Sequence, residues 1–195
     1  YPVDFKAMNL SALSMPGHKG LMGPSGIGAL LLSRDFAQNL TPIATGGTGS
    51  ASDSEAQPNY MPDKFESGTP NVPGIYGLQA AVDFILNTGV DAMQRREQEL
   101  TKRFLDGLRD VKGIRLAGSW ELENRVGVIS IDFETIDNAE AAYQLEQDYG
   151  LHCAPAAHKP LGTFPQGNVR FSPGHYTTEE EIDAAVKAIA ELAQG

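Results

Sequence analysis

The segment that decides the fold lies near the start of the chain and reads Pro16-Gly17-His18-Lys19-Gly20-Leu21-Met22-Gly23-Pro24-Ser25-Gly26-Ile27-Gly28. Apolar runs at residues 12–15 and 27–32 flank it, and each has the length of a short strand. Glycine permits positive φ and close backbone approach, so the turn can hold Lys19 on a rigid base. Lys19 could therefore reach into a site, although on spacing alone a solvated lysine in an ordinary surface turn is the more common case. The run 27–32 is apolar on both faces and predicts a central strand of a covered sheet.

Working outward, the chain predicts further α and β elements. Residues 41–69 are rich in Gly, Ser, Thr, Pro and Asp, which favours a long ordered loop. Apolar periodicity then predicts one helix around residues 75–86 and a second over about 90–110, with a break at 87–89. The remainder predicts a small α+β unit. Its expected elements are strands at 113–116, 126–133 and 169–172, a helix at 138–148, and a final helix that begins at Thr177 or Thr178.

Composition restricts the classes of partner. The formal net charge of −10 argues against nucleic acid, because phosphate backbones bind basic surfaces. No apolar run approaches the roughly 18 residues that a membrane span requires, so no membrane is expected as a partner. The lone cysteine, Cys153, excludes an internal disulfide and fits a reducing cytoplasm. With only His152, Cys153 and His158 close together in the sequence, no metal site is predicted.

Three further segments could carry chemistry. Successive amides and hydroxyls in residues 45–50 could bind an anion, although a flexible loop is the simpler interpretation. In residues 150–155, Cys153 beside His152 could be a nucleophile of lowered pKa or a structural cysteine. Arg170 lies in an apolar strand, where it needs either a substrate carboxylate or an internal ion pair.

Taken in order, these motifs resemble those of a known family, whereas no single motif is specific enough to indicate it. Residues 18–28, 46–50, 65–71, 150–155 and 169–172 together resemble class V aminotransferases, whose fold is the type I fold of pyridoxal 5′-phosphate (PLP) enzymes. Within that family the chain looks like the cysteine desulfurase and selenocysteine lyase branch. The resemblance implies an α/β fold. Residues 1–88 would be the C-terminal part of the PLP-binding large domain, 89–110 a connecting helix, and 111–195 the small α+β C-terminal domain.

The resemblance also implies a role for each candidate residue. Lys19 would match the lysine that forms a Schiff base with PLP, and His18 the neighbour that contacts the phosphate. Thr48 would contact the phosphate in the other subunit of a homodimer. Arg170 would bind the α-carboxylate of a cysteine-like amino acid. Cys153, expected to be a thiolate on a mobile or exposed loop, would take its sulfur, leaving alanine and a persulfide for an acceptor protein.

Three departures from the family pattern define the rival interpretations. The chain opens at Tyr1 almost directly in a motif, which suggests a C-terminal half whose partner half is needed for folding. Pro16 stands where the family usually has a hydroxyl residue, and the strand expected between residues 149 and 151 is missing. The alternatives are therefore a class V aminotransferase, a selenocysteine lyase, or a non-catalytic remnant that acts as an interaction or dimerisation module.

Overall fold

The chain divides into two units, Pro2–Val90 and a second that begins at Asp91, which are described separately. The structure is a computed structural model that describes residues 2–51, 53–156, 162 and 164–194. Among these residues, none of the helices is both long enough and apolar enough to cross a bilayer.

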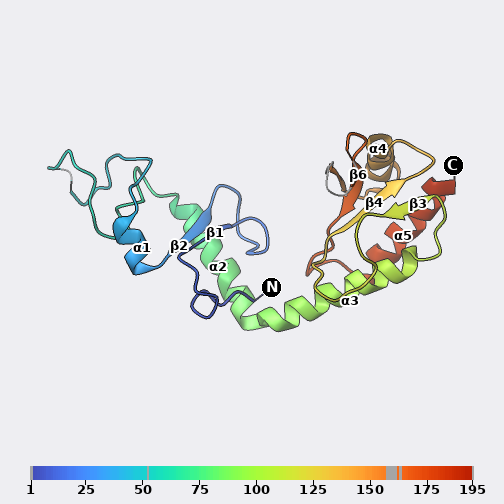
Figure 1. Ribbon diagram of the computed structural model, residues 1–195, viewed down its shortest axis with the longest axis horizontal. Coiled ribbons are helices and arrows are strands. Elements are labelled where there is room, and N and C mark those ends of the chain that lie inside the picture. The colour runs from blue at the N-terminus through green and yellow to red at the C-terminus, as the bar shows by residue number, and fades with distance from the viewer. Residues whose placement is uncertain (1, 52, 157–161, 163, 195) are drawn as a thin grey trace. The chain divides into compact units, whose positions relative to one another are not determined.

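The first unit is built on an antiparallel hairpin (Figure 1). Strand β1 (Ala12–Pro16) pairs with β2 (Gly28–Leu32), with Pro16 opposite Gly28 at the turn. A short helix, α1 (Arg34–Asn39), follows, and α2 (Val72–Thr88) closes the unit. The described residues between 40 and 71 form no helix or strand, so the predicted long loop is confirmed. Helix α1 has no counterpart in the sequence analysis, because six residues are too few for apolar periodicity to develop.

The prediction that residues 27–32 form a central, covered strand is wrong for this structure. Within the described residues β2 pairs with β1 alone. Leu30 is 52% exposed, and Leu31 is exposed as well. Ala37 is the single buried hydrophobic side chain among the described residues of this unit. The apolar run demands cover on both faces, and no described segment of the unit supplies it.

Helix α2 is capped by local residues at both ends. The side chain of Asn71 accepts a hydrogen bond from Gly74 N at 3.1 Å, and Pro73 occupies the first turn, where its missing N–H costs nothing. Gly89 follows the last turn with φ 86°, a conformation that glycine adopts without strain. The predicted helix and its break are confirmed.

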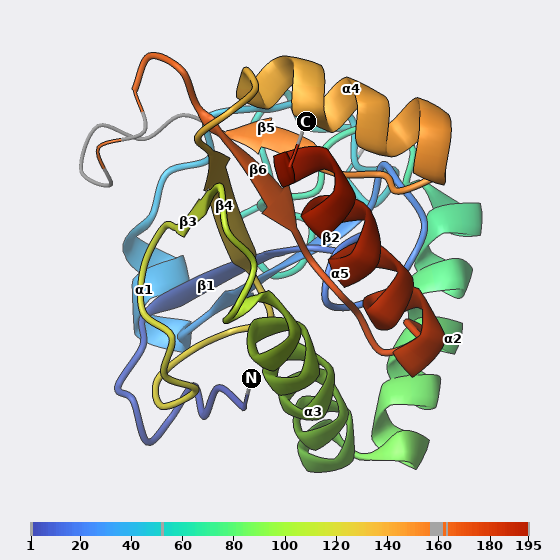
Figure 2. The same cartoon turned by 90° about the vertical axis from the view of Figure 1, so that its right-hand side faces the viewer.

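The second unit is an antiparallel sheet covered by helices (Figure 2). The strand order is β3-β4-β6-β5. Its elements are α3 (Val90–Leu108), β3 (Ile114–Leu116), β4 (Ile129–Phe133), α4 (Asn138–Tyr149), β5 (Ala154–Ala156), β6 (Asn168–Phe171) and α5 (Glu179–Gln194). Helix α4 lies against β4, β5, β6 and α5. All the predicted elements of this unit are present, and β5 is an addition.

The core of the second unit lies on one face of this sheet. Along β4, the side chains of Ile129, Ile131 and Phe133 are buried and alternate with less buried ones, the period expected of a strand with one covered face. Leucine and phenylalanine side chains of α3 and α4 and the apolar stripe of α5 complete the core. Its largest fully buried members are Phe104, Leu100, Leu105, Leu108, Ile129, Ile131, Leu145, Ile189 and Val169.

The predicted cap of the last helix is confirmed in detail. Thr178 Oγ1 accepts a hydrogen bond from Glu181 N at 3.1 Å, and Thr178 N donates to Glu181 Oε2 at 2.8 Å. This reciprocal pair satisfies two N–H groups at the start of α5. The acidic first turn also complements the positive end of the helix dipole.

Candidate functional site

The turn that carries Lys19 is shaped by glycines that leave no room for a side chain. A Cβ on Gly17 would lie 2.7 Å from Ile27 O, and one on Gly28 would lie 2.8 Å from Met15 O. Gly17 N donates to Ile27 O at 2.9 Å, which closes the base of the turn. The close approach of neighbouring backbone atoms therefore explains why Gly17 and Gly28 are glycines. Positive φ is found elsewhere in this turn, at Gly26 and at Met22, which is not a glycine.

Lys19 and His18 project from the first part of this turn and are exposed. Met22 N donates to Lys19 O at 2.8 Å, so the backbone of the lysine is fixed while its side chain is not. In the described part of the chain, neither side chain has a hydrogen-bond or ion-pair partner. Lys19 thus presents an unpaired primary amine from a rigid base.

Asn71 connects this turn to α2, a role that the sequence analysis missed. Its Nδ2 donates to Gly26 O at 3.2 Å while its Oδ1 caps the helix. Residues 65–71 are therefore part of the support of the Lys19 turn. The motif was visible in the sequence, but an asparagine before Val-Pro-Gly indicates only a helix cap.

Thr48 lies half-buried in the long loop of the first unit. Its Oγ1 is 2.8 Å from Ser50 Oγ, and Ser50 Oγ donates to Asp63 Oδ2. Tyr60 OH also donates to Ser50 Oγ, at 3.0 Å. The loop is thus ordered by side-chain hydrogen bonds, as the sequence interpretation of an ordered loop requires.

Cys153 corrects an expectation. It is 8% exposed rather than on an exposed loop, and its Sγ lies 3.8 Å from Ala142 O of α4. Burial raises the pKa of the Cys153 thiol, and the charge of Glu146 raises it further. Cys153 is buried because the connection that carries it is short: α4 ends at Tyr149 and β5 begins at Ala154. This leaves too little chain for a loop.

His152 does not act on Cys153 in this arrangement. The imidazole is exposed, with Nδ1 3.4 Å from Glu146 Oε1, whereas the neighbouring thiol faces the core. The pairing of nucleophile and base that activates a catalytic thiol is absent between these two residues. In this conformation the Cys153 thiol is a buried side chain of the core.

We expect native Cys153 to react with iodoacetamide at pH 8 far more slowly than Cys153 in urea, because only an accessible thiolate reacts. The folded state holds the thiol proton more tightly than the unfolded chain. The free energy of unfolding should therefore fall as the pH rises above about 8.5, and Cys153→Ala should remove that fall. Mass spectrometry of timed alkylation and urea titrations at several pH values provide the measurements. Equal native and unfolded alkylation rates would contradict the burial.

Arg170 lies on the opposite face of the sheet from Cys153. It stands opposite Ser130 of β4 and Ala154 of β5, and its side chain is exposed. The alternative of an internal ion pair finds no partner among the described residues. Arg170 and Cys153 are therefore close along the sheet but face different environments.

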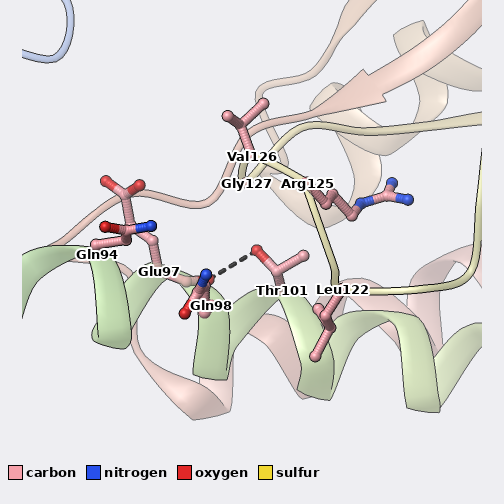
Figure 3. Close-up of a pocket in the computed structure, with 8 residues that line it drawn as sticks. All are labelled: Gln94, Glu97, Gln98, Thr101, Leu122, Arg125, Val126 and Gly127. Carbon is pink, nitrogen blue, oxygen red and sulfur yellow. Dashed lines mark hydrogen bonds between the residues drawn. The ribbon is translucent and has the colours of Figure 1, made fainter. Parts of the chain in front are cut away.

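A small cavity lies within the second unit, between α3 and the segment 122–127 (Figure 3). Its volume is about 30 Å³, enough for a water molecule. Thr101 Oγ1 donates to Glu97 O at 2.7 Å on the α3 side, and Arg125 lies in the facing segment with its guanidinium donating to Ser119 O and Val128 O. Burial lowers the pKa of Arg125. Among the described residues, no group of three or more His, Cys, Asp or Glu could hold a metal ion.

Comparison with known proteins decides the family. The family model described as aminotransferase class-V matches residues 1–185. The chain belongs to the class V aminotransferase family. The resemblance to this family, which the order of the motifs indicated, is confirmed. PLP is the cofactor of the family.

Relatives of this class V chain are named as cysteine desulfurases. A probable cysteine desulfurase of Pyrococcus abyssi is 33% identical over 198 residues, covering 97% of this chain and 48% of the relative. The apo structure of cysteine desulfurase from Thermococcus onnurineus NA1 superposes with a TM-score of 0.84 at 30% identity, covering 98% of this chain and 49% of that one. The cysteine desulfurase CsdA from Escherichia coli gives 0.81 at 26% identity, covering 100% and 48%. The predicted α/β fold, part of a type I PLP fold, is confirmed, and the class V chain spans about half the length of these relatives.

Proposed function

We propose that this chain is part of a PLP-dependent cysteine desulfurase, which converts L-cysteine to L-alanine and passes the sulfur on. The observation that carries the proposal is the unpaired, exposed amine of Lys19 on its glycine-closed turn, in a chain that matches the class V family over residues 1–185. Residues 1–88 would belong to the PLP-binding large domain, 89–110 to the connecting helix and 111–195 to the small domain.

The residues present fit the cofactor. The Lys19 amine, which has no ion-pair partner in the described chain, could react with the aldehyde of PLP. The exposed imidazole of His18 and the Thr48 loop offer hydrogen-bond donors to its phosphate. When bound, PLP supplies an electron sink for chemistry at the substrate Cα. Lys19 would hold the cofactor covalently and, once released from it, would move protons. Pro16 supplies no N–H to the phosphate, so these donors would have to come from His18 and the loop.

Arg170 and Cys153 would act on the substrate. The exposed guanidinium of Arg170 can take the α-carboxylate in a bidentate pair. The Cys153 thiolate would attack the sulfur of the bound cysteine. The carbon–sulfur bond then breaks, a sulfur–sulfur bond forms on Cys153, and the carbon takes up a proton to leave alanine. The carbon is reduced and the sulfur is oxidised, so no other oxidant is required. Cys153 must leave the core for this step.

The proposal extends to partners and location. Since the resemblance assigns Thr48 to a neighbouring site, the protein would act as a homodimer, and a protein thiol would accept the persulfide sulfur. A lone cysteine that must alternate between thiol and persulfide suits the reducing cytoplasm.

A second candidate is a class V aminotransferase reaction, and the burial of Cys153 favours it. Transamination needs Lys19 and Arg170 but no thiol. Selenocysteine lyase activity is a variant of the first candidate, distinguished by the selenium substrate.

The two candidates are separated by Cys153→Ala in the protein expressed from its complete coding sequence. We expect the wild type to be yellow with PLP and, with an added thiol to reduce the persulfide, to release sulfide and alanine from L-cysteine in equal amounts. The variant should still take up PLP, lose sulfide release and keep any transamination. Sulfide release that survives in Cys153→Ala would overturn the desulfurase role of this thiol, and a wild type that takes up no PLP would overturn the whole proposal.

A further inference from the structure

A pocket lies between α1 and the later part of the loop that follows this helix. Its volume is about 520 Å³, within the range of roughly 300–1,000 Å³ that is usual for sites that bind small molecules. The end of β2, α1 and the segment 59–64 line the pocket, so it lies wholly within the first unit. Lys19, His18 and Thr48 are not among the residues that line it. The pocket is therefore distinct from the residues assigned to the cofactor.

A buried lysine forms part of the pocket wall. The Lys64 side chain is 5% exposed, and its Nζ donates to Ala37 O and to Gln38 O, both at 2.9 Å. Nζ also lies 5.5 Å from the centroid of the Phe65 ring. These partners are all neutral, and no carboxylate of the described chain forms an ion pair with Nζ. A buried cation is usually paired with an anion, so Lys64 retains a positive charge that a ligand could neutralise.

A second cation, Arg34, lines the same pocket. Arg34 is the first residue of α1, and its side chain is exposed. Within the residues that the structure describes, its guanidinium has no hydrogen-bond or ion-pair partner. None of the described aspartate or glutamate residues lines the pocket, although the chain as a whole has a formal net charge of −10. The pocket is thus locally positive in an acidic protein, which favours an anionic ligand.

Much of the remaining wall is apolar. Leu32 and Ala37 contribute side chains from β2 and α1, and Met61 and the ring of Tyr60 contribute from the loop. Tyr60 is 52% exposed and Met61 is 49% exposed. Tyr60 OH already donates to Ser50 Oγ at 3.0 Å, so the ring is the part of this side chain that remains for a ligand. Exposed apolar side chains at a pocket suit a ligand with an apolar body.

We propose that this pocket binds a small organic carboxylate with an apolar or aromatic body. The guanidinium of Arg34 would pair with the carboxylate, because its fork of N–H groups matches the two carboxylate oxygens. The charge of Lys64 would add to the attraction, and the apolar body would pack on Leu32 and Met61. The inference does not require PLP chemistry, so it stands or falls separately from the proposed function.

The test titrates phenylacetate into the protein expressed from its complete coding sequence, with isotope-labelled methionine methyl groups observed by NMR. We expect the Met61 methyl signal, identified by its loss in Met61→Leu, to shift with a dissociation constant of about 1 mM, a usual value for a ligand of this size. Phenylacetamide has the ring without the charge, and acetate has the charge without the ring. Each should bind at least roughly tenfold more weakly than phenylacetate.

Arg34→Gln should raise the dissociation constant of phenylacetate by roughly tenfold, the effect of losing a charge-assisted pair. Lys64→Met should also raise it, and Arg34→Gln decides the question alone if Lys64→Met misfolds, because Arg34 is exposed. Lys6→Ala is the matched control, since Lys6 is an exposed cation of the same unit that does not line the pocket. Arg170→Gln should leave the constant measured at Met61 unchanged, because Arg170 does not line the pocket either.

The inference is overturned if the Met61 signal does not move or if phenylacetamide moves it at the same concentration. Binding that is lost in Arg170→Gln but kept in Arg34→Gln would place the probe at the proposed substrate site and would also overturn it. Release of PLP during the titration, followed by absorbance, would place the probe in the cofactor site with the same consequence. A protein that takes up no PLP overturns the proposed function, whereas the titration of this pocket is read in the same way.

Discussion

Replacing Lys19 with alanine is expected to abolish covalent retention of PLP and to lower turnover by roughly 10²–10⁴-fold, the usual contribution of a positioned proton-transfer group. Lys19 is the lysine that the glycine-closed turn holds in place, and its amine has no partner in the described chain. The measurement is borohydride reduction followed by peptide mass spectrometry, together with a turnover assay on L-cysteine. The mass of reduced PLP should be found on the Lys19 peptide of the wild type alone.

Lys6→Ala is the matched control, because Lys6 is an exposed lysine of the same unit outside the glycine turn. It should retain PLP and turnover. Retention of borohydride-fixed PLP by Lys19→Ala would show that another amine holds the cofactor.

Replacing Phe104 with alanine is expected to lower the free energy of unfolding of the second unit by about 3–5 kcal/mol. Phe104 is fully buried and packs edge-to-face on Phe171 of β6, with ring centroids 5.3 Å apart and an interplanar angle of 82°. The change removes the ring contact between α3 and β6 and leaves a cavity between them. Urea unfolding followed by tryptophan fluorescence provides the measurement. The sole tryptophan, Trp120, packs against this core and reports on this unit.

Tyr143→Ala is the control for the loss of an aromatic ring. Tyr143 lies on α4 of the same unit but is 60% exposed, so its removal should change the free energy of unfolding by only about 0.5 kcal/mol. A similar loss in both variants would contradict the packing of Phe104 in the core.

Local chemistry made much of the fold predictable. The break at Gly89, the start of α5 at Thr178 and the strand β4 depend on neighbours in sequence, and each was confirmed. Helix α1 was not predicted, because six residues are too few for helical periodicity, and strand β5, which reads Ala-Pro-Ala, shows no alternation of apolar and polar residues. The central position expected for β2 failed for a different reason: an apolar run indicates that a strand needs cover but not which polypeptide supplies it.

The candidate site was predictable in its residue types but not in its geometry. Lys19 is exposed on its turn, as expected, because glycine spacing fixes a turn locally. The burial of Cys153 depends on the length of chain between α4 and β5, and the pairing of Asp63 with Ser50 depends on how a long loop folds on itself. Nothing in a single sequence encodes those distances directly.

The antiparallel pairing of β5 with β6 has a consequence for the thiol that precedes it. With Ala154 opposite Arg170, extending the ladder by one residue sets Cys153 opposite Phe171, whose ring faces the core. Successive residues of a strand face opposite sides, so sliding this short edge strand by a single residue along β6 would transfer Cys153 to the side where Arg170 is exposed. A buried thiol and a thiol on the face of Arg170 are thus separated by a shift of one residue in strand register.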